Sequence, residues 1–169
     1  MALAGVVWVI DTSSIIEVRR AVTVAVRKKT FAGLTQLVNG QRLVYPPEVL
    51  DELERNTDLK NPDEQYQWTK ASATAAHARA TCDLDDVKSV LAEVPTILDP
   101  EKESGVEEAD PYVLAVARKL RAAGVDARVV TQESKDTPTK MSMSTAAGVL
   151  GIPCVPLKAF LAAESIPST

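Results

Sequence analysis

The chain reads Val6-Val7-Trp8-Val9-Ile10-Asp11 near its start, an uninterrupted apolar run that ends in a single carboxylate. A continuous run rich in β-branched residues is typical of a strand that is covered on both faces. Thr12, Ser13 and Ser14 follow, and side chains of this kind cap helices at their N-termini. The stretch therefore predicts a central β-strand that leads through Asp11 into a helix.

Shorter apolar runs recur along the chain and alternate with helical patterns. Further strands or extended segments are expected at residues 42–45, 94–98, 128–130 and 154–155. Helices are expected at residues 22–38, from Pro47 onward, and at 64–80, 84–91, 111–123, 142–150 and 157–163. Strands that alternate with helices imply a parallel sheet with helices on both faces. The 169 residues are therefore expected to form one domain, a three-layer α/β/α sandwich with a central, mostly parallel sheet.

The composition is that of an ordinary globular protein, with 46% apolar and 25% charged residues. No apolar run reaches the ~20 residues that a membrane-spanning helix needs. Residues 1–5 lack the basic start of a secretory signal, and Cys82 and Cys154 form neither a metal-binding pair nor a disulfide framework. We therefore expect a cytoplasmic protein without a membrane segment.

Four carboxylates follow an apolar run or precede a helix: Asp11, Glu52, Asp110 and Glu133. Glu52 lies at the rim of the apolar stripe of its helix, whereas Asp110 falls within a buried stripe and needs a partner. In parallel α/β sheets, ligands bind beyond the carboxyl ends of the strands, where Asp11 and Glu133 fall. Hard oxygen ligands without nearby His or Cys select Mg²⁺ or Mn²⁺. An acidic cup of this kind suits the hydrolysis of phosphodiesters.

Each of these carboxylates also has a purely structural interpretation. Asp11 can cap the next helix, and Asp-Pro at residues 110–111 is a favoured capping pair. Glu52 can be a solvated acid on a polar helix face. Glu133 lies two residues beyond Thr131 and can be a surface loop residue.

Neighbouring polar residues could support the same centre. Thr12 and Ser13 could hydrogen-bond Asp11 or a water molecule of the metal. Glu107 lies one turn before Asp110 and is a possible helper.

The net charge of −4 argues against a protein whose whole surface binds nucleic acid. One stretch is locally basic, with a single acid, Glu17, among five positive side chains. These are Arg19, Arg20, Arg27, Lys28 and Lys29. They could contact the phosphates of RNA, or they could form a solvated helix face.

Taken in order, these motifs resemble those of the PIN-domain nucleases. The matching segments are Asp-Thr-Ser-Ser-Ile-Ile at 11–16, Pro-Pro-Glu-Val-Leu-Asp-Glu-Leu at 46–53, Glu-Glu-Ala-Asp-Pro-Tyr-Val-Leu-Ala at 107–115, Val-Val-Thr at 129–131 and Leu-Gly-Ile-Pro-Cys-Val at 150–155. The chain looks most similar to a PIN-like bacterial group related to VapC-type toxins. The resemblance spans residues 6 to about 161 and implies a single PIN-like domain.

By this resemblance, Asp11, Glu52 and Asp110 would be the core metal ligands of an endoribonuclease that uses Mg²⁺ or Mn²⁺. The fourth acid of the family is usually an Asp or Asn just after the Val-Val-Thr strand. This chain has Gln132 and Glu133 there instead, so Glu133 would be that ligand.

The resemblance also implies supporting residues and partners. Positions that commonly support the metal or its waters are matched by Thr131 and by Thr12 or Ser13. Many relatives are toxins that a cognate antitoxin protein holds inactive, and many form homodimers. RNA would be the substrate.

Other classes of protein fit the sequence less well. A phosphoacceptor receiver domain needs adjacent acids after its first strand, and an aspartyl phosphatase needs an Asp where Ser13 stands. His77 is the only histidine, and no Gly-rich phosphate loop occurs. The main alternative is a PIN-fold protein without nuclease activity that serves as an RNA-binding or protein-interaction module.

Overall fold

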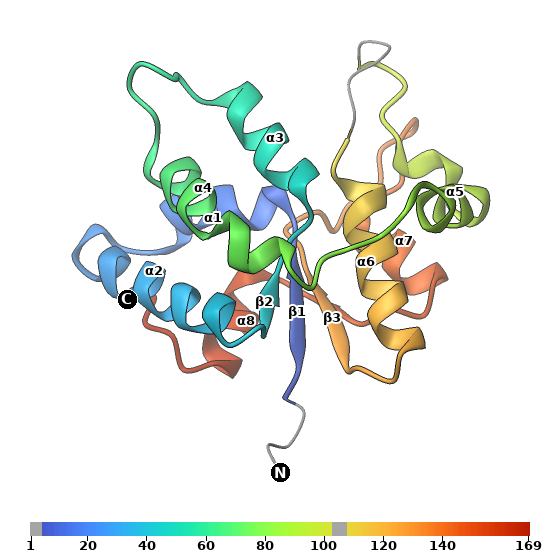
Figure 1. Cartoon of the computed structure of the whole chain (residues 1–169). Coiled ribbons are helices and arrows are strands. Elements are labelled where there is room, and N and C mark those ends of the chain that lie inside the picture. The colour runs from blue at the N-terminus through green and yellow to red at the C-terminus, as the bar shows by residue number, and fades with distance from the viewer. Residues whose placement is uncertain (1–4, 103–107) are drawn as a thin grey trace.

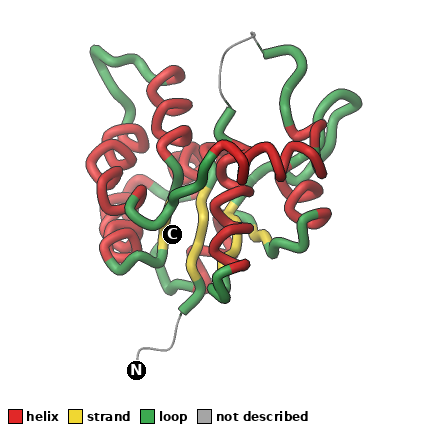
Figure 2. The backbone as a smooth tube through the Cα atoms, turned by 45° about the vertical axis from the view of Figure 1, so that its right-hand side comes forward, coloured by secondary structure: helices red, strands yellow, loops and turns green. Residues whose placement is uncertain are grey.

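In the computed structural model, residues 5–102 and 108–169 are described, and the four strands among them form one sheet. The strands are β1 (Val7–Ile10), β2 (Leu43–Val44), β3 (Ala127–Val130) and β4 (Cys154–Val155). Their order is β2-β1-β3-β4, and every neighbouring pair is parallel (Figures 1 and 2). The predicted α/β fold with a parallel sheet is confirmed.

Strand β1 lies inside the sheet, as its continuous apolar sequence predicts. All four of its residues are buried. It pairs with β3 along its whole length, ending with Ile10 opposite Val130, and the backbone N–H of Asp11 donates to the carbonyl of Val130 at 3.1 Å. The chains that leave β1 and β3, at Asp11 and Thr131, therefore start side by side at one edge of the sheet.

Helices connect and follow the strands. They are α1 (Thr12–Ala21), α2 (Val24–Asn39), α3 (Pro47–Asn56), α4 (Glu64–His77), α5 (Leu84–Glu93), α6 (Asp110–Ala122), α7 (Met143–Val149) and α8 (Leu157–Ala163). The expected extended segment at 94–98 is wrong, because a 3-10 turn, η1 (Pro95–Ile97), stands there. Pro95 fixes φ and has no N–H to donate to a β-ladder, which favours the turn.

The helices cover both faces of the sheet. Helix α6 packs against β1 and β3 on one face. On the other face, Phe160 of α8 makes an edge-on ring contact with Trp8 at 5.1 Å between centroids, and α8 also contacts α1 (Figure 1). The result is the three-layer α/β/α sandwich that the sequence predicts.

The topology creates a binding position at the carboxyl edge of the sheet. From β1 the chain first adds β2 on one side, and β3 and β4 then follow on the other side. Ligands of open parallel sheets bind where the strand order reverses in this way, here between β1 and β3. Helices α1, α3 and α6 all begin at this edge (Figure 1).

None of the helices in the described ranges combines the length and the apolar content that crossing a membrane requires.

Candidate functional site

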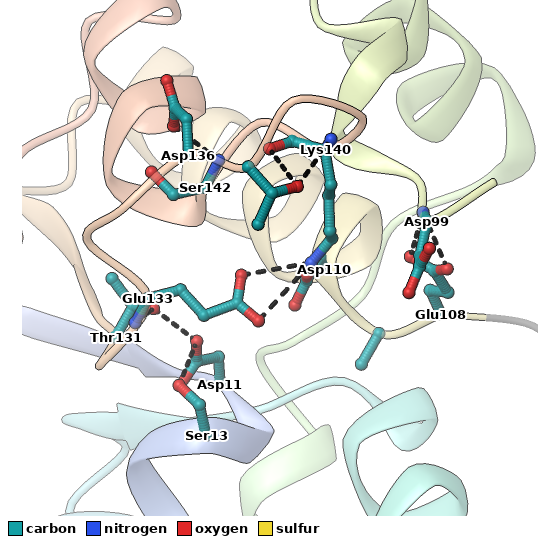
Figure 3. Close-up of polar contacts among 12 residues, drawn as sticks. Asp11, Ser13, Asp99, Glu108, Asp110, Thr131, Glu133, Asp136, Lys140 and Ser142 are labelled. Atoms are coloured by element: carbon teal, nitrogen blue, oxygen red, sulfur yellow. Dashed lines mark hydrogen bonds and ion pairs between the residues drawn. The ribbon is translucent and has the colours of Figure 1, made fainter. Parts of the chain in front are cut away.

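Asp11 is the most deeply buried acid at this edge, with 1% of its surface exposed. Its carboxylate accepts hydrogen bonds from the backbone N–H of Ser14 (2.9 Å), from the hydroxyl of Ser13 (2.8 and 2.9 Å to its two oxygens) and from the hydroxyl of Thr131 (2.5 Å). Because donors from both α1 and the end of β3 hold it, the carboxylate has a fixed orientation (Figure 3).

Asp11 is therefore the N-cap of α1, which confirms the prediction that it caps this helix. Burial raises its pKa from 3.8 to about 6, while the hydrogen bonds from Thr131, Ser14 and Ser13 oppose the rise. A carboxylate that served only as a helix cap should have a lowered pKa, because the positive end of the helix dipole stabilises its ionised form. The high pKa marks a carboxylate that lacks a nearby positive charge.

The supporting residues named from the sequence take two different positions. Ser13 and Thr131 bind Asp11 directly, and Thr131 also accepts a hydrogen bond from the backbone N–H of Glu133 at 3.1 Å. Thr12 is 4% exposed, and its hydroxyl oxygen is buried with no hydrogen-bond partner among the described residues. A buried hydroxyl without a partner is costly, so this oxygen is suited to bind something further.

Asp110 is the first residue of α6 and is 8% exposed. The predicted Asp-Pro capping pair does not form, because Asp110 already belongs to the helix and one of its oxygens accepts from Lys140 Nζ at 3.0 Å. Burial raises its pKa to about 7; Glu133 and Asp11 add to the rise, and Lys140 opposes it. Figure 3 shows Asp11, Asp110 and Glu133 within one small region.

Glu133 turns its carboxylate toward Asp110, with Lys140 Nζ between them at 3.2 and 3.4 Å from the two oxygens of Glu133 (Figure 3). Its side chain is 36% exposed. The sequence left open whether Glu133 was a loop residue or a ligand. The structure places it at the solvent side of the acidic cluster.

The segment from Gln132 to Ser142 positions Lys140. A tight turn forms where the N–H of Thr137 donates to the carbonyl of Lys140 at 2.9 Å, and Asp136 accepts from the backbone N–H of Ser142 at 2.8 Å. Gln132 fixes the start of the segment by accepting from the N–H of Leu157 at 2.7 Å. Lys140 is therefore presented by an ordered loop.

Glu52 contacts the start of α6 from α3. One of its oxygens accepts a hydrogen bond from the backbone N–H of Ala109 at 3.0 Å, immediately before Asp110. Glu52 is half-buried, so its interpretation as a fully solvated acid is wrong. Its observed contact stabilises the N-terminus of α6, where free N–H groups and the helix dipole favour a carboxylate.

Substitutions at Glu52 separate this helix contact from metal binding. Glu52→Gln keeps an oxygen that can accept from Ala109, so we expect a metal-free stability within about 0.5 kcal/mol of the wild type. Glu52→Ala removes the acceptor and should cost about 1 kcal/mol. Urea unfolding in EDTA measures both. A loss in Glu52→Gln as large as in Glu52→Ala would contradict the hydrogen-bond explanation.

Glu107, named as a helper of Asp110, lies outside the described residues. The neighbouring Glu108 is 5% exposed and accepts from the backbone N–H of Asp99 at 3.0 Å. Glu108 also forms an ion pair with Lys102 at 3.8 Å. Glu108 therefore anchors the segment before α6, and its carboxylate is engaged in these contacts.

The acids do not converge closely enough to hold a metal as they stand. Within residues 5–102 and 108–169, no three His, Cys, Asp or Glu side chains form a group that could hold a metal ion. The donor chemistry nevertheless suits a hard cation, because the carboxylates of Asp110 and Glu133 already hold a positive charge, the ammonium of Lys140. Carboxylate oxygens are ligands that Mg²⁺ or Mn²⁺ prefers, although these carboxylates would have to draw together to hold either ion.

The basic stretch lies along the far part of α1 and the start of α2, away from this edge. Arg27 is engaged within the protein, since it donates to the carbonyls of Arg19 (3.0 Å) and Val22 (3.3 Å) and pairs with Glu64 at 3.5 Å. The side chains of Arg19, Arg20, Lys28 and Lys29 are exposed. A role of this stretch in RNA binding stays a prediction, with Arg27 the least available of the five.

Lys140 is the residue that the sequence did not reveal. It stands in a polar loop nine positions after Thr131 and carries no motif of its own. Only the folded loop brings it between Asp110 and Glu133. A cation next to two predicted acidic ligands, Asp110 and Glu133, is visible in three dimensions but not in the spacing of the chain.

Comparison with known families gives one match. Residues 8–167 match the model of a family described as a domain of unknown function, DUF4411. No curated protein and no solved structure matches the chain.

Proposed function

This chain belongs to the DUF4411 family, whose function is unknown, and we propose that it is a PIN-like, metal-dependent endoribonuclease. One observation carries the proposal. Two buried carboxylates with raised pKa values, Asp11 and Asp110, lie in one region at the point where the strand order reverses, and Asp110 shares the ammonium of Lys140 with Glu133. Ionising buried acids is costly without a counter-charge, so the site favours a bound cation.

Asp11, Asp110 and Glu133 would hold Mg²⁺ or Mn²⁺, and Glu52 would join them if it left Ala109. When bound, such an ion stabilises negative charge on the reacting phosphate and lowers the pKa of water. The protein's own part is to fix the donors. Ser13 and Thr131 hold the Asp11 carboxylate in one orientation, so this donor is already fixed before a cation binds.

A place for the substrate adjoins the acids. A cavity of about 450 Å³ shares Glu133 and Lys140 with the cluster and is otherwise lined by Gln132, Ser134, Lys135, Thr137, Met141 and Ser142. Hydroxyl, amide and ammonium groups can bind phosphate and sugar oxygens, and the Met side chain offers a surface for a base. A strand of RNA lying in this cavity would bring a phosphodiester to the carboxylates.

The test of this proposal is cleavage of RNA. The purified protein should cleave a mixed-sequence single-stranded RNA when Mn²⁺ or Mg²⁺ is added, and EDTA should abolish the cleavage. A gel of end-labelled RNA measures the products, with a preparation heated before the assay as the control for contaminating nucleases. Equal cleavage in EDTA and in Mn²⁺ would contradict a metal-dependent mechanism.

One observation favours the alternative, a PIN-fold module without catalysis. Lys140 already neutralises Asp110 and Glu133, as a permanent internal counter-ion would in a site that needs no metal. Calorimetric titration with Mn²⁺ separates the two functions. Binding of one or two ions supports the nuclease, and no binding at millimolar Mn²⁺ supports the module. The cognate antitoxin and the homodimer that the resemblance implies stay predictions.

A further inference from the structure

Lys140 occupies an unusual position for a surface-loop lysine. Its ammonium lies 3.0 Å from Asp110 Oδ2 and 3.2 Å from Glu133 Oε2, and its side chain is only 19% exposed. Burial alone would lower its pKa, but the carboxylates of Asp110 and Glu133 outweigh burial and raise it. Lys140 therefore stays charged, and it holds together two acids that would otherwise repel one another.

The same carboxylates cannot serve this ammonium and a divalent metal at once. A metal ion held by Asp110 and Glu133 would occupy the present position of the Lys140 ammonium. Two cations so close together in a partly buried site repel one another strongly. Binding of metal therefore requires Lys140 to move. The free energy of breaking its two ion pairs would be subtracted from the affinity for the metal.

The displaced ammonium has a place to go. Lys140 forms part of the wall between the acidic cluster and the 450 Å³ cavity described above, and Lys135, which is exposed, lines the same cavity. Rotation of the side chain away from Asp110 would bring a second positive charge to this cavity. Two ammonium groups beside a metal suit a phosphate oxygen of a nucleic acid.

We propose that Lys140 is an exchangeable cation: it takes the place of the metal between Asp110 and Glu133 in the metal-free protein and, once displaced, binds a phosphate of the RNA in the adjoining cavity. The inference rests on the proposed function and adds a regulatory step to it. The site would bind its metal first, and the metal would in turn create the full binding site for the substrate.

The first experiment measures metal affinity by calorimetric titration of Mn²⁺ at pH 8. Lys140→Met removes the competing charge and keeps the length of the side chain, so we expect Mn²⁺ to bind about tenfold more tightly than to the wild type. Lys140→Arg keeps the charge and should not bind more tightly than the wild type. Lys88→Met, which removes an exposed lysine from α5, should leave the affinity for Mn²⁺ unchanged.

The outcomes separate the inference from the proposed function. Equal or weaker binding in Lys140→Met overturns the inference and leaves the nuclease standing. Binding by neither protein overturns the proposed function and the inference with it. Binding by Lys140→Met alone would show that the wild-type lysine excludes the metal permanently, which overturns both the exchange and the proposed function.

A second measurement needs no variant for its main result. In ¹⁵N-detected lysine spectra of the metal-free protein, an ammonium held by two carboxylates should give a slowly exchanging side-chain signal, assigned through its loss in Lys140→Arg. Adding Mg²⁺ should remove the signal. A signal that persists at saturating Mg²⁺ would show that metal and lysine do not compete.

The phosphate contact is tested by the binding of RNA. With Ca²⁺ in place of Mn²⁺, and with the integrity of the RNA checked on a gel, fluorescence anisotropy gives the affinity for a labelled single-stranded 12-mer. We expect Lys140→Met and Lys135→Met each to weaken binding several-fold, by loss of one phosphate contact. Lys88→Met should bind as the wild type does. Undiminished binding by Lys140→Met would overturn the second half of the proposal.

Discussion

Replacing Asp110 with Asn is expected to lower Mn²⁺-dependent cleavage of RNA by roughly 10³-fold while the protein stays folded. Asp110 is buried at the N-terminus of α6, beside Asp11 and Glu133, and an amide there cannot supply the negative charge that holds a cation. The amide oxygen can still accept from Lys140, so the loop that carries this lysine keeps a contact. The loss should therefore appear in kcat and in the affinity for Mn²⁺, and not in the circular dichroism spectrum.

The matched control is Asp85→Asn, which removes an exposed carboxylate from the first turn of α5. It changes the net charge by the same amount and should leave cleavage within about twofold of the wild type. Rates of cleavage of one labelled RNA, measured side by side, give the comparison. If Asp110→Asn cleaves RNA as fast as Asp85→Asn does, Asp110 takes no part in the mechanism.

Replacing Asp11 with Asn should stabilise the metal-free protein at pH 8, by about 1–3 kcal/mol. Burial makes the ionised carboxylate of Asp11 unfavourable, and an amide carries no such charge. The amide can preserve the surrounding contacts, because its oxygen accepts from the N–H of Ser14 and the hydroxyls of Ser13 and Thr131 can turn to meet its N–H groups. Catalysis would be lost while stability rises.

The pH dependence of this effect follows from the pKa of Asp11. In the unfolded chain the group has a pKa of 3.8, and in the folded protein of about 6. Between these values the folded protein holds a proton that the unfolded chain has lost. The contribution of Asp11 to the free energy of unfolding therefore falls as the pH rises from roughly 4 to 6 and is constant above. The advantage of Asp11→Asn should grow over the same interval and then level off.

Urea unfolding of both proteins in EDTA at pH 4, 6 and 8 measures this difference. Asp126→Asn is an informative control, since Asp126 is exposed and its pKa is lowered by a hydrogen bond from Arg128. Its removal should not stabilise the protein at any of these pH values. An Asp11→Asn protein clearly less stable than the wild type at pH 8 would mean that the capping charge of Asp11 outweighs its cost of burial.

Much of the fold could be predicted because local sequence and global position agree in it. The apolar run at residues 6–10 favours a buried strand inside the sheet. Asn39-Gly40 and Gly124 end helices where the sequence indicates. The helix expected after Asp11 is present as α1. One segment was wrong, because residues 94–98 contain a turn instead of an extended segment.

The site could be predicted only in part. Strand ends locate Asp11, Thr131 and Glu133, because chains leaving parallel strands meet at one edge of the sheet. The contact between Glu52 and Ala109 could not be foreseen, since it depends on how α3 is oriented toward α6. Lys140 could not be foreseen either, because its place depends on the turn at Thr137 and on the fold of a loop without periodic sequence.

Crystals soaked in Mn²⁺ test most directly whether a divalent cation binds among Asp11, Asp110 and Glu133. Diffraction recorded at the manganese absorption edge should show an anomalous peak in contact with the carboxylates of Asp11, Asp110 and Glu133, and Lys140 should have moved away from Asp110. Crystals saturated with Mn²⁺ that show no such peak, with Lys140 still bound to Asp110 and Glu133, would contradict the account.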